Sequence, residues 1–509
     1  MSGGEAPEKA PEKSAPTGGA PTHEPPEGAS TTGTWHGVEY AATARWLVLR
    51  KEEKPTAEVF SVAYVVGDGE ERPVTFVFNG GPGASSAYLH VGALGPQRVD
   101  VPGDGTMPAP PPRLVTNDDS WLAFTDLVFV DPVGTGFSRM IEKDGKDGES
   151  KDADDPTAYF GTDRDLAAMA EFIGRWLSEN GRWSSPVFLA GESYGGYRVG
   201  RLTRVLQESA GIGIAGSILI SPALEFAGLA VGALGGGDYD VVPWVDVLPT
   251  MVLAAHHHGR SRAFAPETAL AEVRRAAEEF ATGEYAVFLT RGASMPVEDR
   301  ERVMQRLADL LGLSLAFVTR MAGRVRVATF TRELLRDEGR VIGRYDATVT
   351  TTDPFPDREV FTGGDPTLTG IGPVFTAGVN RVLRSEIGVD TDREYKLLNT
   401  DVVMSWKNDA AGVYLQPIPG ATDDFRYGMA LNPHTRAFIT HGRHDLQTPY
   451  FATDRLCNLM RLDPGTAERL TVHHFEGGHM FYAWTESRRE FTAAIARFVD
   501  EATPVASPS

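Results

Sequence analysis

Short apolar runs recur along the chain, and most are followed by a segment rich in glycine, proline or charged residues. Runs of this kind are typical of strands that are buried in a sheet. They predict strands at residues 45–50, 57–66, 73–78, 126–130, 216–220, 436–441 and 470–475, with another that starts at Pro186.

Helical patterns lie between these runs. Apolar residues from Leu166 to Leu177 recur every three or four positions, with aspartate and arginine on the opposite side, which predicts an amphipathic helix. Further helices are predicted directly after Ser193, at 451–461 and at 485–500. Strands that alternate with helices indicate a mostly parallel central sheet with helices on both faces, so we expect an α/β fold.

The alternation stops between residues 241 and 354. This stretch has amphipathic patterns at 266–281, 297–311 and 329–337 and no convincing central strand. We therefore expect a helical cap that is inserted into the α/β domain and lies over the upper edge of the sheet.

The cap divides the α/β core into two sequence segments, residues 35–240 and 355–509. Residues 1–34 differ from both, because they are mostly Pro, Gly, Glu, Ala and Thr. Such a segment cannot bury enough apolar surface to offset the entropy of ordering its backbone. We expect it to be a disordered tail.

Charge and cysteine content narrow the function classes. The 49 basic and 69 acidic residues give a net charge of −20, which disfavours nucleic acid and anionic membranes as partners. Cys457 is the only cysteine, so no intramolecular disulfide can form. No secretory signal or apolar membrane span is visible, so the sequence predicts a cytoplasmic location.

A serine between glycines marks a candidate nucleophile. Gly191-Glu-Ser-Tyr-Gly195 follows a predicted strand and precedes a predicted helix, as in a nucleophile elbow, where small residues allow a strained turn that exposes the serine hydroxyl. The alternative is an ordinary surface turn, since a chain with 55 glycines can contain this pattern by chance.

A nucleophilic serine needs a histidine base and an acid that orients it, and in this fold the chain order is serine, acid, histidine. After Ser193, the candidates that directly follow strands are Asp445 and His479. His473 and His474 are predicted to lie within a strand and to have a packing role.

Backbone amides must stabilise the oxyanion of the tetrahedral intermediate. The amide of Tyr194 is one candidate, and the Asn79-Gly80-Gly81 loop offers a second, although that loop can also be read as a tight turn. His256, His257 and His258 could suggest a metal site, but consecutive residues cannot all point at one ion. We expect no metal and no cofactor.

Together these loops resemble the serine carboxypeptidase family over roughly residues 36–500. The matching motifs are Asn79-Gly-Gly-Pro-Gly-Ala-Ser-Ser86, Gly95-Pro96, Pro132-Val-Gly-Thr-Gly-Phe-Ser138, Gly191-Glu-Ser-Tyr-Gly-Gly196, Gly442 to Asp445 and Gly478-His-Met480. The resemblance implies an α/β-hydrolase fold and a peptide substrate.

Residue by residue, the resemblance implies Ser193 as nucleophile, Asp445 as orienting acid and His479 as general base and acid. It further implies that the amides of Gly81 and Tyr194 form the oxyanion hole. Asn79, Gly80 and Glu192 would bind the free carboxylate at the C-terminus of the peptide. A glutamate can accept a carboxylate only if the two share a proton, which requires acidic conditions or a raised pKa.

The sequence departs from the family pattern at several positions. Val77 stands where many eukaryotic members have tryptophan, and Ala84 where they have cysteine. Ala93 replaces the glutamate of the family's Glu-Leu-Gly-Pro motif, so the second carboxyl that would share the recognition proton is missing. With these departures and without disulfides, the sequence resembles a bacterial, cytosolic branch of the family.

The sequence thus predicts a serine-type carboxypeptidase that acts through an acyl-enzyme. An acyltransferase or esterase with the same Ser193, Asp445 and His479 is the first alternative. A binding protein with a vestigial site is the second.

Overall fold

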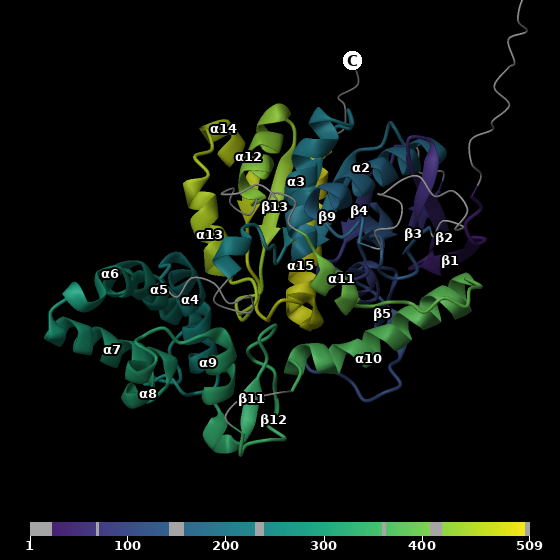
Figure 1. Cartoon of the computed structure of the whole chain (residues 1–509). Coiled ribbons are helices and arrows are strands. Elements are labelled where there is room, and N and C mark those ends of the chain that lie inside the picture. The colour runs from purple at the N-terminus through teal and green to yellow at the C-terminus, as the bar shows by residue number, and fades with distance from the viewer. Residues whose placement is uncertain are drawn as a thin grey trace, which may run out of the picture.

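The molecule is built around one ten-stranded sheet (Figure 1). The structure is a computed structural model that describes residues 23–67, 71–141, 157–229, 239–358, 363–407 and 420–503. The sheet strands are β1 (Ala29–Trp35), β2 (Val38–Lys51), β3 (Lys54–Val66), β4 (Val74–Phe78), β7 (Asp126–Val130), β8 (Arg139–Met140), β9 (Val187–Glu192), β10 (Gly216–Ile220), β13 (Arg436–Thr440) and β14 (Leu470–Val472).

The sheet has an antiparallel part and a parallel part. Its order is β1-β2-β3-β7-β4-β9-β10-β13-β14, with β8 paired to β3. The pairs from β1 to β7 are antiparallel, and those from β7 to β14 are parallel. The prediction of a mostly parallel central sheet is confirmed. The carboxyl ends of the parallel strands lie at one edge, which is where ligands bind in open α/β sheets.

Helices cover both faces of the sheet, as the strand sequences require. In β4, Phe76 packs with the helices of one face and Val77 with those of the other, because successive side chains of a strand point to opposite sides. The first face is covered by α2 (Thr162–Glu179), α3 (Tyr194–Glu208) and α12 (Thr422–Leu431). The second is covered by a π-helix (His90–Leu94), α10 (Pro366–Asn380) and α15 (Thr485–Ala502).

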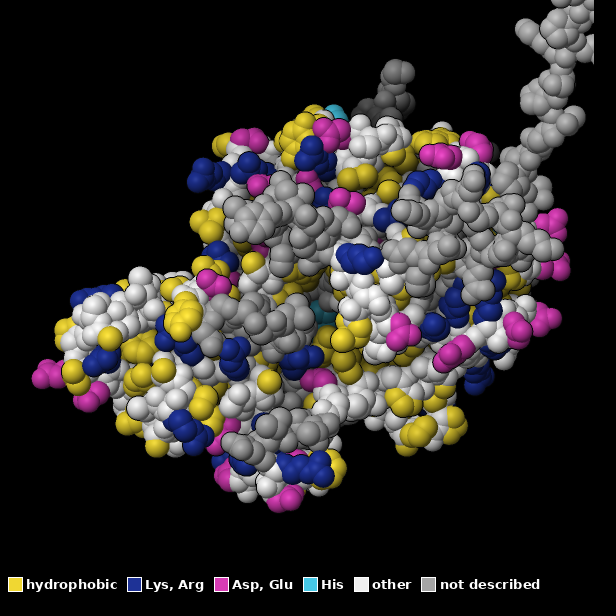
Figure 2. All heavy atoms as spheres, in the orientation of Figure 1, with side chains coloured by type: hydrophobic (Ala, Val, Ile, Leu, Met, Phe, Trp, Pro, Cys, Tyr) yellow, Lys and Arg dark blue, Asp and Glu magenta, His cyan; other side chains and the backbone are white. Residues whose placement is uncertain are grey.

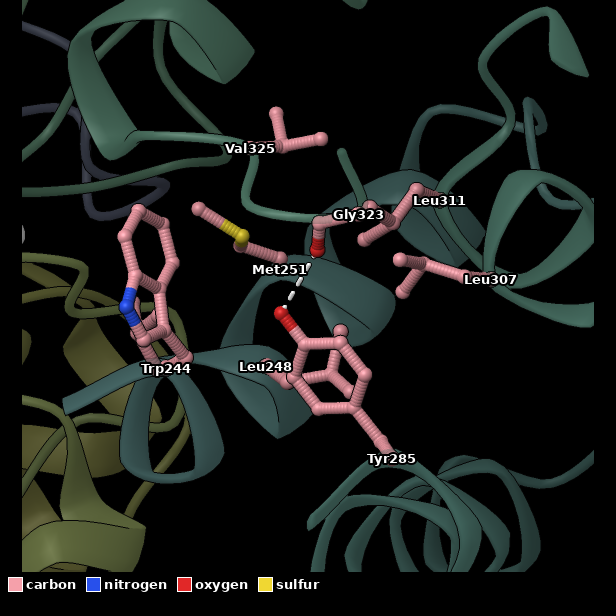
Figure 3. Close-up of a pocket in the computed structure, with 9 residues that line it drawn as sticks. Trp244, Leu248, Met251, Tyr285, Leu307, Leu311, Gly323 and Val325 are labelled. Atoms are coloured by element: carbon pink, nitrogen blue, oxygen red, sulfur yellow. Dashed lines mark hydrogen bonds between the residues drawn. The ribbon is translucent and has the colours of Figure 1, made fainter. Parts of the chain in front are cut away.

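Residues 242–333 form a separate helical group, at the lower left of Figure 1, which we call the cap. Its helices are α4 (Val242–His257), α5 (Leu270–Phe280), α6 (Ala286–Arg291), α7 (Val297–Leu311), α8 (Leu315–Arg320) and α9 (Val327–Glu333). They pack around their own apolar cluster. Figure 3 shows a small apolar pocket in this cluster, where the Tyr285 hydroxyl donates a hydrogen bond of 2.8 Å to the Gly323 carbonyl.

A short hairpin follows the cap helices and was not predicted. It pairs β11 (Arg340–Ile342) with β12 (Thr350–Thr352). No clear strand pattern marks it, because both strands are three residues long and β12 consists of threonine. The turn between the strands reaches the sheet, since the Leu446 amide donates to the Arg344 carbonyl and the Ala347 amide to the His444 carbonyl, each at 3.0 Å.

The start of the described chain differs from the predicted disordered tail. Residues 29–35 form β1, which pairs with β2 along its whole length. An edge strand is held mainly by main-chain hydrogen bonds, so its polar threonines do not prevent pairing. Trp35 anchors the strand because its Nε1–H donates to the Asn117 carbonyl at 2.8 Å. Residues 1–22 lie outside the described part of the chain.

The surface shows no single dominant charge on the face in Figure 2. Lysine and arginine side chains are interspersed there with aspartate and glutamate, despite the net charge of −20. Within the described ranges, no helix combines the length and apolar character that crossing a bilayer requires.

Candidate active site

Ser193 lies in a strained turn between β9 and α3. Its backbone has φ +62° and ψ −121°, a conformation that a residue with a side chain rarely adopts. The turn needs a glycine two residues before the serine, because a Cβ on Gly191 would lie 2.1 Å from the Gly195 carbonyl oxygen. This geometry is that of a nucleophile elbow and places Ser193 at the carboxyl edge of the sheet.

The acid and histidine loops meet as the sequence predicted. Asp445 follows β13, and His479 lies after β14, the next strand of the sheet. The His479 Nδ1–H donates to Asp445 Oδ2 at 2.6 Å, and both side chains are buried. Burial alone would lower the pKa of His479, but the charge of Asp445 and this hydrogen bond raise it above its usual value, and the Glu192 charge adds to the effect.

Asp445 is held by a loop whose contribution the sequence did not reveal. The amides of Gln447 and Thr448 donate to Oδ1 at 2.8 and 3.0 Å. The Thr448 hydroxyl lies 2.6 Å from Oδ2 and 3.1 Å from His479 Nδ1. The spacing Asp445-Leu-Gln-Thr448 was a signal that could have been used, since aspartate commonly accepts amides two and three residues onward.

Two further residues fix the backbone of His479. The Ser221 hydroxyl, directly after β10, donates to the His479 carbonyl at 2.9 Å. On the other side, the His479 amide donates to the Tyr345 carbonyl at 2.5 Å. The Gly478 amide donates to Asp346 Oδ2 at 3.0 Å, so the turn between β11 and β12 holds the histidine loop.

The glycine loop after β4 lies directly against the elbow. A Cβ on Gly80 would come within 2.6 Å of the Tyr194 nitrogen and 2.7 Å of Ser193 Cβ, so only glycine fits there. The Arg198 guanidinium of α3 donates to the Asn79 carbonyl at 3.1 Å. Neither the Gly81 nor the Tyr194 amide donates a hydrogen bond to another described residue. Within the described chain, both predicted oxyanion-hole donors are therefore free.

Asn79 and Glu192 form a buried pair beside Ser193. Asn79 Nδ2 donates to Glu192 Oε1 at 3.1 Å, and Asn79 Oδ1 accepts from the Leu89 amide at 2.9 Å. Glu192 Oε2 is buried and has no hydrogen-bond partner among the described residues. Burial raises the pKa of Glu192 to about 7, although His479, Tyr482 and Asn79 act in the opposite direction. The side chain can therefore hold a proton near neutral pH.

An apolar cavity adjoins this pair. Its wall includes Met480, which follows His479, and Tyr482, whose hydroxyl interacts with Glu192. The remaining wall residues are Gly92, Val99, Val101, Met107, Ile371, Phe375 and Ala483. The cavity is therefore bounded by the π-helix, by α10 and by the histidine loop.

The other histidines of this region support the loops. Although β14 ends at Val472, main-chain bonds from His473 and Phe475 to β13 and the acid loop continue its pairing. His474 bonds to Asp454 at 2.8 Å, and His441 Nδ1–H donates to the Thr448 carbonyl at 3.0 Å. Both rings have structural roles.

The three consecutive histidines at the end of α4 point in different directions. His256 Nε2 bonds to the Thr268 carbonyl at 3.1 Å and His258 Nε2 to the Ala347 carbonyl at 2.7 Å. The His257 ring lies 5.5 Å from that of His444. Within the described residues, no group of three or more His, Cys, Asp or Glu side chains is arranged to hold a metal ion.

The comparisons with known proteins agree with this site. Residues 51–233 match the family model for serine carboxypeptidases. Serine carboxypeptidase-like 5 of Arabidopsis thaliana is 31% identical over 172 residues, which cover 31% of this chain and 34% of that protein. A pheromone-processing carboxypeptidase of Sclerotinia sclerotiorum is 33% identical over 145 residues, covering 27% of this chain and 19% of that protein.

The sequence similarity is confined to part of the chain. It spans about a third of the first relative and about a fifth of the second. The family match includes Asn79, Glu192 and Ser193 but stops before Asp445 and His479, so the contact between the last two is seen in the structure alone.

Structural similarity extends further than sequence similarity. A prohormone-processing carboxypeptidase from Saccharomyces cerevisiae superposes with a TM-score of 0.56 at 13% identity, covering 91% of this chain and 92% of that one. The chain thus has the α/β-hydrolase fold.

Proposed function

We propose that the protein is a serine-type carboxypeptidase that removes C-terminal residues from peptides through an acyl-enzyme. The observation that carries this proposal is the buried Asn79–Glu192 pair directly beside the elbow serine. The pKa of Glu192 is raised to about 7, so a protonated Glu192 can donate a hydrogen bond to a peptide's terminal carboxylate. A general esterase has no need for such a group.

In the first step, the Ser193 hydroxyl attacks the carbonyl carbon of the last peptide bond. His479 takes the hydroxyl proton through Nε2, and Asp445 stabilises the resulting imidazolium through Nδ1–H. The Gly81 and Tyr194 amides donate to the oxyanion. When the carbon–nitrogen bond breaks, His479 returns the proton to the leaving amine, and the C-terminal amino acid departs.

In the second step, water attacks the ester that joins the peptide to Ser193. His479 now removes a proton from this water and then gives it back to the serine oxygen, which releases the shortened peptide. The residues named here supply every proton transfer, so the reaction needs no metal or cofactor.

Substrate binding has two parts. We place the terminal carboxylate against Glu192, Asn79 and the Gly80 backbone, and the side chain of the last residue against the apolar wall that Met480, Tyr482 and Phe375 form. The apolar wall favours an apolar C-terminal residue, because no charged side chain of the described chain contributes to it. Charge balance does not favour nucleic acid or a membrane as a partner.

The proposal is tested by the release of free amino acid from N-blocked dipeptides between about pH 4 and 8. The matching C-terminal amides are assayed in parallel, and Ser193→Ala serves as the control. We expect release from the free acids, little from the amides, and a loss of at least about 10⁴-fold in kcat for Ser193→Ala.

Three results would contradict the carboxypeptidase proposal. Equal activity on acids and amides would show that the Asn79–Glu192 pair does not recognise the terminal carboxylate. No release from either, while a fluorophosphonate still labels Ser193, would point to the acyltransferase or esterase alternative. If the reagent does not label Ser193 at all, the site is vestigial.

We also propose that the protein belongs to a bacterial branch of these enzymes and acts in the cytoplasm. The support is the single cysteine, Cys457, because a fold without disulfides does not depend on an oxidising compartment. Fractionation of the source cells would test the location.

A further inference from the structure

Tyr482 lies where the carboxylate-binding pair meets the apolar cavity. The residue is in the short 3-10 turn Phe481–Ala483, three positions after His479. Its ring packs against the π-helix, since a Cβ on Gly92 would lie 3.2 Å from Tyr482 Cε2. The next residue of that helix is Ala93, at the position where the serine carboxypeptidase pattern has glutamate.

The Tyr482 hydroxyl is buried and makes no well-formed hydrogen bond within the described chain. The side chain is 1% exposed, and its oxygen has no partner that meets normal hydrogen-bond geometry. The same is true of Glu192 Oε2, although the two groups lie close enough for a weak hydrogen-bonding contact that lowers the pKa of Glu192 and raises that of Tyr482. A phenol that serves only packing could be a phenylalanine, because a buried polar atom without a partner costs free energy. Two such atoms side by side indicate a site that a ligand completes.

We propose that Tyr482 is a substrate-binding residue whose hydroxyl donates a hydrogen bond to the terminal carboxylate of the peptide, next to protonated Glu192. The inference rests on the proposed carboxypeptidase function and deepens it. Ala93 stands where the family pattern has a second carboxyl group, and the Tyr482 phenol supplies the hydrogen bond in place of that carboxyl. One carboxylate oxygen then accepts from Glu192 and the other from Tyr482.

This replacement changes how recognition depends on pH. A second carboxyl would lose its own proton as the pH rises, and the pair would then repel the substrate. The phenol keeps its proton, because burial and the neighbouring Glu192 charge raise the pKa of Tyr482 well above its usual value. Glu192 is left as the one titrating group of the clamp, so carboxylate binding should persist up to about neutral pH.

Tyr482→Phe tests the proposal on N-blocked dipeptides and their methyl esters. We expect KM for the free acids to rise about tenfold, because a hydrogen bond to a charged group is lost, and the esters to change less. The alkaline limb of kcat/KM for the free acids should move to higher pH, since the hydroxyl no longer lowers the pKa of Glu192. A purely structural role would not move this limb.

The variant is suited to this test because it should fold. Removing a buried hydroxyl that makes no well-formed hydrogen bond within the described chain should leave the midpoint of thermal unfolding unchanged or higher. Tyr285→Phe is the matched control. It removes a buried phenol hydroxyl in the cap, which bonds to the Gly323 carbonyl, and should change neither the acid-to-ester ratio nor the pH profile.

The outcomes separate this inference from the proposed function. If the wild-type protein releases amino acids but Tyr482→Phe keeps the same acid-to-ester ratio and the same alkaline limb, the role of Tyr482 is refuted and the carboxypeptidase function stands. If the wild-type protein releases nothing from free acids, both proposals fall together.

Discussion

Two buried carboxyl groups of the candidate site, Asp445 and Glu192, differ in how they are bonded. Asp445 is fully buried, and each oxygen has two polar neighbours: the Gln447 and Thr448 amides at Oδ1, and the Thr448 hydroxyl and His479 at Oδ2. Glu192 is 4% exposed, but among the described residues only Asn79 makes a well-formed hydrogen bond to it, at Oε1, and Oε2 is left without one.

The hydrogen bonds of Asp445 are complete within the protein, whereas those of Glu192 would be completed by a ligand. A carboxylate that accepts several hydrogen bonds is held in one orientation, as a group that orients an imidazolium must be. A carboxyl that is buried with one oxygen unpaired takes up a proton instead, and it can then donate that proton to an anion. A carboxyl group thus serves as an orienting acceptor in the Asp445 loop and, at Glu192, as a proton-dependent clamp at the end of β9.

The largest expected effect comes from changing Asp445, the carboxyl group whose two oxygens are both hydrogen-bonded. Asp445→Asn should lower kcat about 10⁴-fold on free acids and esters alike, because the amide no longer stabilises the imidazolium or selects the tautomer of His479. Asp454→Asn is the matched control, since it alters another Asp–His contact, that with His474 at 2.8 Å. A loss of less than about tenfold in Asp445→Asn would show that the acid is elsewhere.

A smaller effect, limited to substrates with a free terminal carboxylate, is expected from the titration of Glu192. The pKa of Glu192 is about 7, so above that pH it loses the proton that the terminal carboxylate needs. For the wild-type protein, kcat/KM on free acids should therefore fall up to about tenfold per pH unit above neutrality.

Glu192→Gln cannot titrate, so this alkaline limb should disappear. The acidic limb should move to lower pH, because the Glu192 charge contributes to the raised pKa of His479. Methyl esters serve as the internal control, since they have no terminal carboxylate to bind. An unchanged alkaline limb in the variant would assign that ionisation to another group.

The smallest effect should come from removing one bond of the well-bonded carboxylate. Thr448→Val keeps the shape of the side chain but loses the hydroxyl at Asp445 Oδ2. We expect kcat to fall by up to about tenfold, because the two amides and His479 still hold Asp445. Thr453→Val, whose hydroxyl contacts His441 at 2.8 Å, is the control. A loss comparable to that of Asp445→Asn would show that Thr448, and not the amides, holds the acid.

The sequence was sufficient for residues that directly follow strands. Ser193, Asp445 and the Asn79 loop come after β9, β13 and β4, and the carboxyl ends of parallel strands meet at one edge. Local patterns therefore predicted which residues come together across more than 350 positions of the chain, from Asn79 to Asp445.

The sequence was insufficient where an interaction depends on packing alone. Helix α4 is apolar on nearly every side because it is the centre of the cap, so it lacks the amphipathic period that revealed α5 and α7. Tyr482 and Glu192 are brought together by the path of the histidine loop, and no spacing in the sequence encodes that contact.

The turn between β11 and β12 limits how freely this protein can be re-engineered. Tyr345 and Asp346 bind the backbone of the histidine loop, and Trp484 Nε1–H also donates to Asp346 at 3.1 Å. The insertion is thus not an interchangeable module: a chimera that exchanges residues 241–354 for the lid of another hydrolase would also discard the scaffold that aims the base at its nucleophile. A successful graft would have to retain the seven-residue connection from Gly343 to Val349 as part of the catalytic framework.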